Sequence, residues 1–327
     1  VLKDIDTSTT PIYLELEFLN AEFVTNITDS KVLVHTDIIS NLIKTGNWYT
    51  NLKEDHKHFE SIVNHTKTLN VKASIYQNAG ANMVQQLAYT LAHTNEYLNH
   101  INNSESLQQT FDKSNNQPLI INIEVSIGSN YFFEIAKLRA LRLLWSSLAS
   151  QYDVNPECYI FVTPTKRNKT LYDYNTNMLR TTTECMSAIL GSSDTVINMP
   201  YDHLYHKDNK FANRLSRNQL LILKNESCFD SVCNPTEGTY YIETLTQQFA
   251  QKSLDLFKEI EKQGGFLKLL KEGVVQRKLK EHAQKEQRLY DQGSEGLLGT
   301  HFQQNKTDKM KLNLEILKSF LKTLHLC

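Results

Sequence analysis

Short runs of β-branched, aromatic and other apolar residues recur along the chain. Such runs favour β-strands, because these side chains pack well on a pleated, half-buried surface. Strands are expected at residues 11–16, 32–38, 71–76, 120–127, 159–162 and 195–198, with a weaker candidate at 232–242. Residues 120–127 alternate polar and apolar side chains, which is typical of a strand whose two faces meet different surroundings.

Helix-like periodicity separates several of these runs. The clearest pattern is in residues 243–262, where large apolar side chains recur at helical spacing: Leu245, Phe249, Leu256, Phe257 and Ile260. Gly264 and Gly265 are expected to end this helix. Further helices are expected at residues 82–101, 131–149 and 266–290, and a short one in the Lys- and Leu-rich tail from Asn305.

The expected helix at 131–149 is apolar over most of its surface. Glu134, Lys137 and Arg142 interrupt it. A helix of this kind is buried on more than one side. Burial in the core and burial at an interface with a partner both fit the sequence.

Alternation of strands and helices over this length predicts βαβ units and a parallel sheet, and so an α/β fold. An open doubly wound sheet and a closed barrel both fit, but no G-x-G-x-x-G follows any strand, which removes the commonest nucleotide-binding signature. The pattern therefore favours a (β/α)8 TIM-type barrel with fewer than eight strands. Residues 1–300 are assigned to this one domain, with a polar loop at 102–118 and a tail at 301–327.

Composition narrows the function. The 327 residues carry a formal net charge of −1, which gives no electrostatic case for binding nucleic acid or an anionic membrane. No apolar run approaches the ~20 residues of a membrane span, and residues 1–6 do not resemble a signal peptide, so a cytoplasmic protein is expected. Five irregularly spaced cysteines argue against a disulfide framework and against a structural metal site.

Several segments, taken in order, resemble the methylmalonyl-CoA mutase family. The first is Gln77 with Ala79-Gly80-Ala81 and the helix Ala88-Tyr89-Thr90-Leu91-Ala92, similar to the family's A-G-A turn and A-Y-T-L-A helix. The others are Phe132-Phe133-Glu134-Ile135-Ala136-Lys137-Leu138-Arg139-Ala140, Asn177-Met178-Leu179-Arg180-Thr181, Ala188-Ile189-Leu190-Gly191, Arg217-Asn218-Gln219, Gly238-Thr239-Tyr240-Tyr241-Ile242-Glu243, Gly264-Gly265-Phe266 and Leu298-Gly299-Thr300. Together they span residues 76 to 300, most of the chain.

The resemblance implies a (β/α) barrel that begins here after its first strand. It also implies a part in the interconversion of methylmalonyl-CoA and succinyl-CoA, in which adenosylcobalamin supplies the radical and the protein orients and protects it. In the family the substrate's CoA threads the barrel axis and the cobalamin caps one end.

This chain departs from the family at several of the family's catalytic and cofactor-binding motifs. The family's Tyr-His pair before the A-G-A turn, whose His donates to the thioester carbonyl, aligns with Ser74 and Ile75. Ile75 cannot form a hydrogen bond, and loss of one such donor typically costs about 10²–10³ in rate. The N-terminal T-M-Y-x-x-R-P-W segment is not found, nor is the cobalamin-binding, flavodoxin-like domain with its D-x-H-x-x-G motif. Residues 202–206 are the nearest match to that motif and do not fit it.

No catalytic residue is therefore assigned. Four residues remain weak cofactor-binding candidates: Gln77, Asp194, Lys166 and Arg167. Asp194 aligns with a family Gln near the corrin ring, and Lys166, Arg167 and Lys169 could hold CoA phosphates or form a solvated loop. His203 and His206 are interpreted as surface residues and not as metal ligands.

Three functions compete. The sequence favours a structural small subunit that pairs with a catalytic large subunit of a mutase heterodimer, where the partner binds adenosylcobalamin and the complex handles the acyl-CoA. The alternative is an active acyl-CoA mutase that uses a separately encoded cobalamin-binding domain. A free CoA-ester-binding protein would need an intact barrel tunnel.

Overall fold

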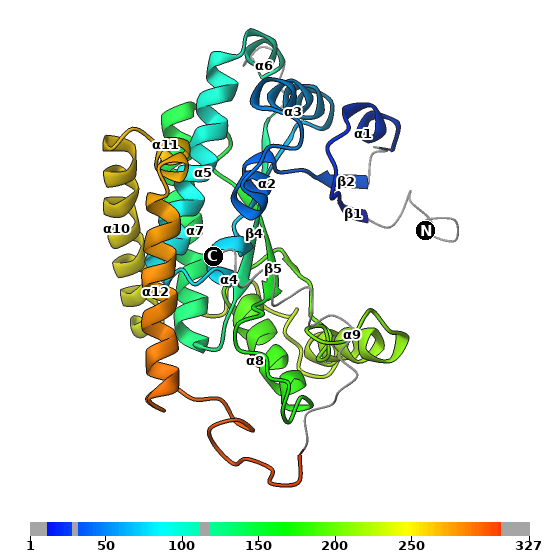
Figure 1. Cartoon of the computed structure of the whole chain (residues 1–327). Coiled ribbons are helices and arrows are strands. Elements are labelled where there is room, and N and C mark those ends of the chain that lie inside the picture. Colours follow the sequence, from blue (N-terminus) through cyan, green and yellow to red (C-terminus); the bar gives the residue numbers. More distant parts are fainter. Residues whose placement is uncertain (1–11, 28–31, 112–117, 309–327) are drawn as a thin grey trace.

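The computed structural model describes residues 12–27, 32–111 and 118–308 (Figure 1). Each of the six expected strands overlaps an observed strand, although the one expected at 71–76 does so only at residues 71–72, and every strand pair is parallel. The strands are β1 (Ile12–Glu15), β2 (Val32–His35), β3 (Thr68–Lys72), β4 (Ile120–Ile127), β5 (Cys158–Pro164) and β6 (Thr195–Val196). β1 pairs with β2, and the other four form a second sheet in the order β3-β4-β5-β6. This is a mixed α/β fold with parallel sheets, compatible with an incomplete TIM-type barrel.

Helices connect the strands and continue after the last one. They are α1 (Ala21–Ile27), α2 (Ile38–Thr45), α3 (Leu52–Thr66), α4 (Ser74–Asn78), α5 (Met83–Asn103), α6 (Glu105–Thr110), α7 (Tyr131–Tyr152), α8 (Thr176–Leu190), α9 (Lys210–Asn225), α10 (Tyr240–Lys262), α11 (Phe266–Lys271) and α12 (Val274–Asp291). The expected helices at 82–101, 131–149 and 243–262 are confirmed as α5, α7 and α10. None of the helices in the described segments is long and apolar enough to cross a lipid bilayer.

The four-stranded sheet has two unlike faces. Alternate residues of β3, β4 and β5 point toward α5 and α7 and join one large apolar core; they include Leu69, Val71, Ile121, Ile123, Ile160 and Val162. We call this side the outer face. α10 lies across α5 and α7 as a further helical layer (Figure 1). The intervening residues form the opposite side, the inner face.

α7 is buried on several sides, within this chain. Its core residues Leu138, Leu141 and Trp145 contact the outer face, while α10 covers it from the other side. The interrupting residues Glu134 and Lys137 are both buried and form an ion pair of 2.5 Å. Of the two uses that fit the sequence, burial in the core accounts for these contacts.

Side chains join β2 to β3, where no backbone ladder is formed. The Asp37 carboxylate, just after β2, accepts hydrogen bonds from the Lys72 backbone N–H (2.7 Å) and the Tyr97 hydroxyl (2.6 Å), and it contacts His93 Nε2 at 3.1 Å. The Asn70 amide also donates to the carbonyl of Val34. Burial acts to raise the pKa of Asp37, but His93 and the hydrogen-bond donors outweigh it and lower the pKa to about 2.

The strand predicted at 71–76 is wrong from residue 73 onward. β3 ends at Lys72, and Ser74–Asn78 form the short helix α4. The Lys72 backbone N–H donates to the Asp37 side chain and not to a neighbouring strand, and the backbone of Ala73 is already helical. β-branched composition at 71–75 was outweighed by this tertiary hydrogen bonding.

Three other expectations are corrected. Residues 232–239 form turns and not a strand, since Asn234 and Gly238 adopt left-handed backbone conformations, and residues 240–242 are the first residues of α10. The loop expected at 102–118 contains α6, and its residues 112–117 lie outside the described part. The helix expected at 266–290 is divided into α11 and α12 at Gly273, whose φ is +73°. The helix expected after Asn305 lies outside the described residues beyond position 308.

Candidate functional site

The inner face of the sheet is polar, which singles it out as the candidate site. TIM-type barrels usually fill their interior with layers of Val, Ile and Leu. Here the inner face carries a set of polar and aromatic side chains drawn from five strands: Tyr13, Glu15, His35, Asn70, Lys72, Asn122, Glu124, Ser126 and Phe161. Polar groups in such positions need partners, because a buried unpaired polar group costs free energy.

A chain of charged and polar side chains crosses this face. Lys72 on β3 forms an ion pair with Glu15 on β1, and its ammonium lies 3.9 Å from the Glu124 carboxylate on β4. The other Glu124 oxygen accepts a hydrogen bond of 2.6 Å from the hydroxyl of the buried Ser74. Nearer the start of the strands, Asn122 donates to the Asn70 side chain at 2.8 Å. The inner face therefore bonds to itself from β1 to β4.

Aromatic rings fill the space between the two sheets. The Phe161 ring on β5 lies 4.9 Å from the Tyr13 ring and 4.8 Å from the His35 ring. Burial lowers the pKa of His35 to about 4, so this imidazole is neutral at pH 7. Among the described residues its Nε2 has no hydrogen-bond partner. Within this aromatic cluster, His35 therefore has a buried ring nitrogen without a hydrogen bond.

Asn78 organises the edge where the parallel strands end. Its amide donates to Ser126 (3.1 Å), and its carbonyl oxygen accepts from the Thr165 hydroxyl and the Lys166 backbone N–H. This carboxyl edge is where barrels of this class place their active sites. In this chain the edge residues after β3, β4 and β5 bond to one another.

Gln77 belongs to a buried cluster behind the same edge. Its carbonyl oxygen accepts from the Lys137 ammonium at 3.2 Å, and its amide contacts the Glu134 carboxylate at 3.3 Å. Lys137 also donates to Gln86 and to the Ser126 carbonyl. Burial lowers the pKa of Lys137, although the Glu134 carboxylate acts in the opposite direction. Both ends of the Gln77 amide are engaged within the protein.

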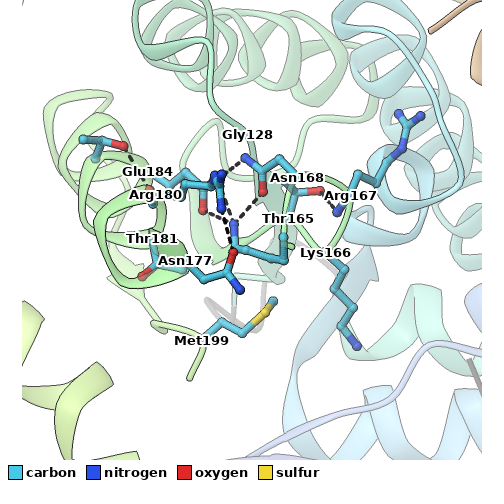
Figure 2. Close-up of polar contacts among 12 residues, drawn as sticks. Gly128, Thr165, Lys166, Arg167, Asn168, Asn177, Arg180, Thr181, Glu184 and Met199 are labelled. Carbon is cyan, nitrogen blue, oxygen red and sulfur yellow. Dashed lines mark hydrogen bonds and ion pairs between the residues drawn. The ribbon is translucent and has the colours of Figure 1, made fainter. Parts of the chain in front are cut away.

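A second buried ion pair fixes the loop between β5 and α8 (Figure 2). The Lys169 ammonium lies 2.7 Å from the Glu184 carboxylate, and Asn168 bonds to both. Burial lowers the pKa of Lys169 and raises that of Glu184. Arg180 extends this network, since its guanidinium donates to Asn177 and to the Leu298 carbonyl. Lys169 is therefore part of the packing of this loop and is not available to a ligand.

The remaining candidates do not meet at one place. Lys166 and Arg167 follow β5 at the carboxyl edge, but Arg167 pairs with Glu286 of α12 at 2.8 Å. Lys166 points away from the cluster of Figure 2, and burial together with the neighbouring cations Lys44 and Lys72 lowers its pKa. Asp194 precedes β6 at the opposite edge and pairs with Arg142 at 2.8 Å.

Ile75 and the two histidines also have definite positions. Ile75 lies in the first turn of α4 and packs against the large apolar core. Ser74, its neighbour, is the residue that faces Glu124. His203 and His206 lie in the turn after β6, and no group of three potential metal ligands occurs in the described part of the chain.

Sequence reasoning overlooked the residues that define the inner face. Glu124 and Lys72 gave no motif, and His35 lies in a segment assigned only by its apolar neighbours. Asn78 lies in the segment that resembles the family's A-G-A turn, but no role was assigned to it. One signal was present: the alternation in 120–127 places Asn122, Glu124 and Ser126 together on one side. It indicated a polar face without indicating what that face meets.

Comparison with known proteins gives the family. The family model described as methylmalonyl-CoA mutase matches residues 6–321. The methylmalonyl-CoA mutase small subunit of Porphyromonas gingivalis is 37% identical over 64% of this chain and 34% of its own length. The small subunit of Streptomyces virginiae is 33% identical over 64% of this chain and 33% of its own, and the large subunit of Propionibacterium freudenreichii is 32% identical over 69% and 31%.

The chain spans about a third of the length of these curated relatives. The match nevertheless covers nearly all of its residues and runs through β1 to α12, including the inner face and the carboxyl edge. The chain therefore belongs to the methylmalonyl-CoA mutase family.

Proposed function

We propose that this chain is a structural small subunit that pairs with a catalytic large subunit of an adenosylcobalamin-dependent methylmalonyl-CoA mutase. One observation carries the proposal: the face that a substrate would occupy is bonded to itself. Ser74 and Lys72 both engage Glu124, Asn78 ties Ser126 to Thr165, and Ile75 offers no hydrogen bond where the family uses a His.

The names of the relatives support the pairing. Two of them are called small subunits and one is called a large subunit, which implies an enzyme of two unlike chains. In such an assembly the large subunit would bind adenosylcobalamin and supply the catalytic groups. The acyl-CoA would be a substrate of the complex, and we place the complex in the cytoplasm.

The residues of this chain do not fit the cobalamin. The family motif that ligates cobalt has its nearest counterpart at Asp202 and His203, and Asp202 is held by the Asn209 amide at 2.8 Å. At the carboxyl edge, Asn78 spends its amide on partners within the chain. We therefore assign no catalytic step to this chain.

The alternative is an active acyl-CoA mutase that uses a separately encoded cobalamin-binding domain. It would need a hydrogen-bond donor for the thioester carbonyl in place of Ile75. The hydroxyl of the adjacent Ser74 is a donor, but it is buried and bonded to Glu124. A ligand would have to displace that bond before it could be held.

The test is co-expression of this chain with the large mutase subunit of the same organism. We expect the two to purify together, and the large subunit to be recovered in a more stable, active form than when it is expressed alone. In a second sample, the active-site His of the large subunit is replaced. The complex of this inactive large subunit with the present chain should show no turnover. Turnover by that inactivated complex would contradict the proposal, because this chain would then supply the chemistry.

A further inference from the structure

One helix has an exposed surface that the fold does not use. α9 packs on α8 through a narrow stripe, in which only Ala212, Ser216 and Leu223 are buried. Gln219 lies on the same stripe and donates to the Met178 carbonyl and the Thr182 hydroxyl of α8. The helix projects at the lower right of the molecule, away from α5, α7 and α10 (Figure 1).

Beside the anchoring stripe runs an apolar stripe that is exposed to solvent. Phe211 is 65% exposed and Ile222 46%, and they lie eleven residues apart with the half-buried Leu215 between them, so they share one side of the helix. Leu179 on α8, next to the Met178 that anchors α9, is 66% exposed. Ile197, next to the Asn198 that bonds to Ser216, is 48% exposed. Large apolar side chains that are exposed on neighbouring elements can mark an interaction site.

A basic stripe follows on the far side of the apolar one. It consists of four exposed cations spaced four, three and seven residues apart: Lys210, Arg214, Arg217 and Lys224. α9 contains no Asp or Glu. Within the described part of the chain none of these four side chains has an ion pair or a hydrogen bond. The chain as a whole carries a net charge of −1, so the surplus of positive charge is local to this helix.

We propose that α9, together with Leu179 and Ile197, is the docking surface for an acidic protein face, which in the assembly proposed above belongs to the catalytic large subunit. The identity of that partner rests on the proposed function. The partner would place apolar side chains against Phe211 and Ile222 and carboxylates against Arg214 and Arg217. Such a pattern, an apolar centre with a charged margin, is that of specific protein interfaces.

The arrangement favours a protein over a lipid surface. A helix that lies in a membrane buries a wide apolar face with cations around it. The side of α9 that carries Ala212 and Leu223 is already packed against α8, and the cations lie along one edge of the remaining surface. What remains is an apolar strip beside a row of cations, with the exposed Leu221 among the cations, and this arrangement fits a complementary protein surface.

The experiment measures the affinity of the whole chain for the large subunit of the same organism, at low and at high salt. We expect R214E/R217E to weaken binding by about tenfold or more at low salt, and F211A/I222A to weaken it by about tenfold at both salt concentrations. All four positions are exposed, so the fold should be retained. The matched control is R277E/K280E on α12, which removes and adds the same charges on another exposed helix and should change the affinity by less than about twofold.

The outcomes separate the two proposals. If the wild-type chain binds the large subunit and both α9 variants bind it equally well, the docking surface is wrong and the subunit role stands. If the wild-type chain does not bind the large subunit, both fail together. If the wild-type chain sediments with phosphatidylserine vesicles, or forms a homodimer in light scattering, and R214E/R217E abolishes this, then a lipid surface or a second copy is the occupant and the proposal is overturned.

Discussion

The two faces of the four-stranded sheet are built on opposite principles, although they share the same strands. On the outer face Ile121, Ile123 and Ile160 are fully buried against α5 and α7, and apolar burial stabilises the fold without directional bonds. On the inner face Asn122 and Glu124, from the same strand β4, are held by specific hydrogen bonds and an ion contact. A face of this second kind is satisfied only in one arrangement.

The outer face specifies the fold, whereas the inner face carries the polar groups of the candidate site. The outer face follows the general rule for a parallel sheet covered by helices. The inner face keeps polar groups at positions that barrels usually fill with Val, Ile or Leu. Because those groups now bond to one another, we infer that the polar character of the face remains while its capacity to hold a ligand is reduced.

The largest expected effect comes from neighbouring residues of β4 that point to opposite faces. Ile123→Ala should destabilise the protein by about 2–5 kcal/mol, since it removes apolar contacts and leaves a cavity. Asn122→Ala should cost about 1–3 kcal/mol, mainly because the Asn70 side chain loses its donor. Chemical denaturation measures both. An equal cost for the two would mean that the inner face is packed like a core.

Asp37 should rank next, because it joins the two sheets. Asp37→Asn removes the charge that holds the Lys72 backbone, Tyr97 and His93 together and is expected to cost about 2 kcal/mol. The pKa of Asp37 is depressed from 3.8 to about 2, so its contribution is complete above pH 4 and is lost as the pH falls toward 2. Acid titration of stability checks this: the variant should be less sensitive than the wild type in that window. Asn51→Ala, which removes the helix cap of α3, serves as a control without a titrating group.

His35 should give a different pH dependence. Its pKa is lowered from 6.5 to about 4, so the unfolded chain takes up a proton in this range and the folded chain does not. Stability should therefore be complete well above pH 6.5 and fall by about 3 kcal/mol as the pH drops to 4. His35→Phe should flatten the curve of unfolding free energy against pH between these values. If the unfolding free energy of the variant kept the same dependence on pH, a group other than His35 would be responsible for it.

The smallest effect is expected at the carboxyl edge. Ser74→Ala removes one hydrogen bond to Glu124, which Lys72 still faces, and should cost about 1 kcal/mol or less. The informative readout is ligand binding and not stability. If the self-bonded face is what excludes a ligand, S74A alone should not create binding of a CoA ester, measured by calorimetry. Binding by the variant and not by the wild type would show that a single hydrogen bond had been closing the site.

Much of the fold could be predicted from the sequence, because the runs of apolar residues located five of the six strands, and helices α5, α7 and α10 have strong apolar periodicity. The end of β3 could not, since the bond from Asp37 to Lys72 joins residues 35 positions apart. The inner face was equally hidden: Glu124 and Lys72 have meaning only when Ser74 and Glu15 lie beside them. Ile75 was identified through the family motif, because a pattern of apolar residues alone would not have distinguished it from other buried residues.

The most direct test of the account is a turnover assay on this chain by itself. The purified chain is supplied with adenosylcobalamin, methylmalonyl-CoA and a separately expressed cobalamin-binding domain, and succinyl-CoA is measured beside a sample that contains the large subunit. We predict that the chain alone forms no succinyl-CoA and that the sample with the large subunit does. Succinyl-CoA formed by the chain without the large subunit would show that its barrel is catalytic despite Ile75, and the role as a structural subunit would have to be abandoned.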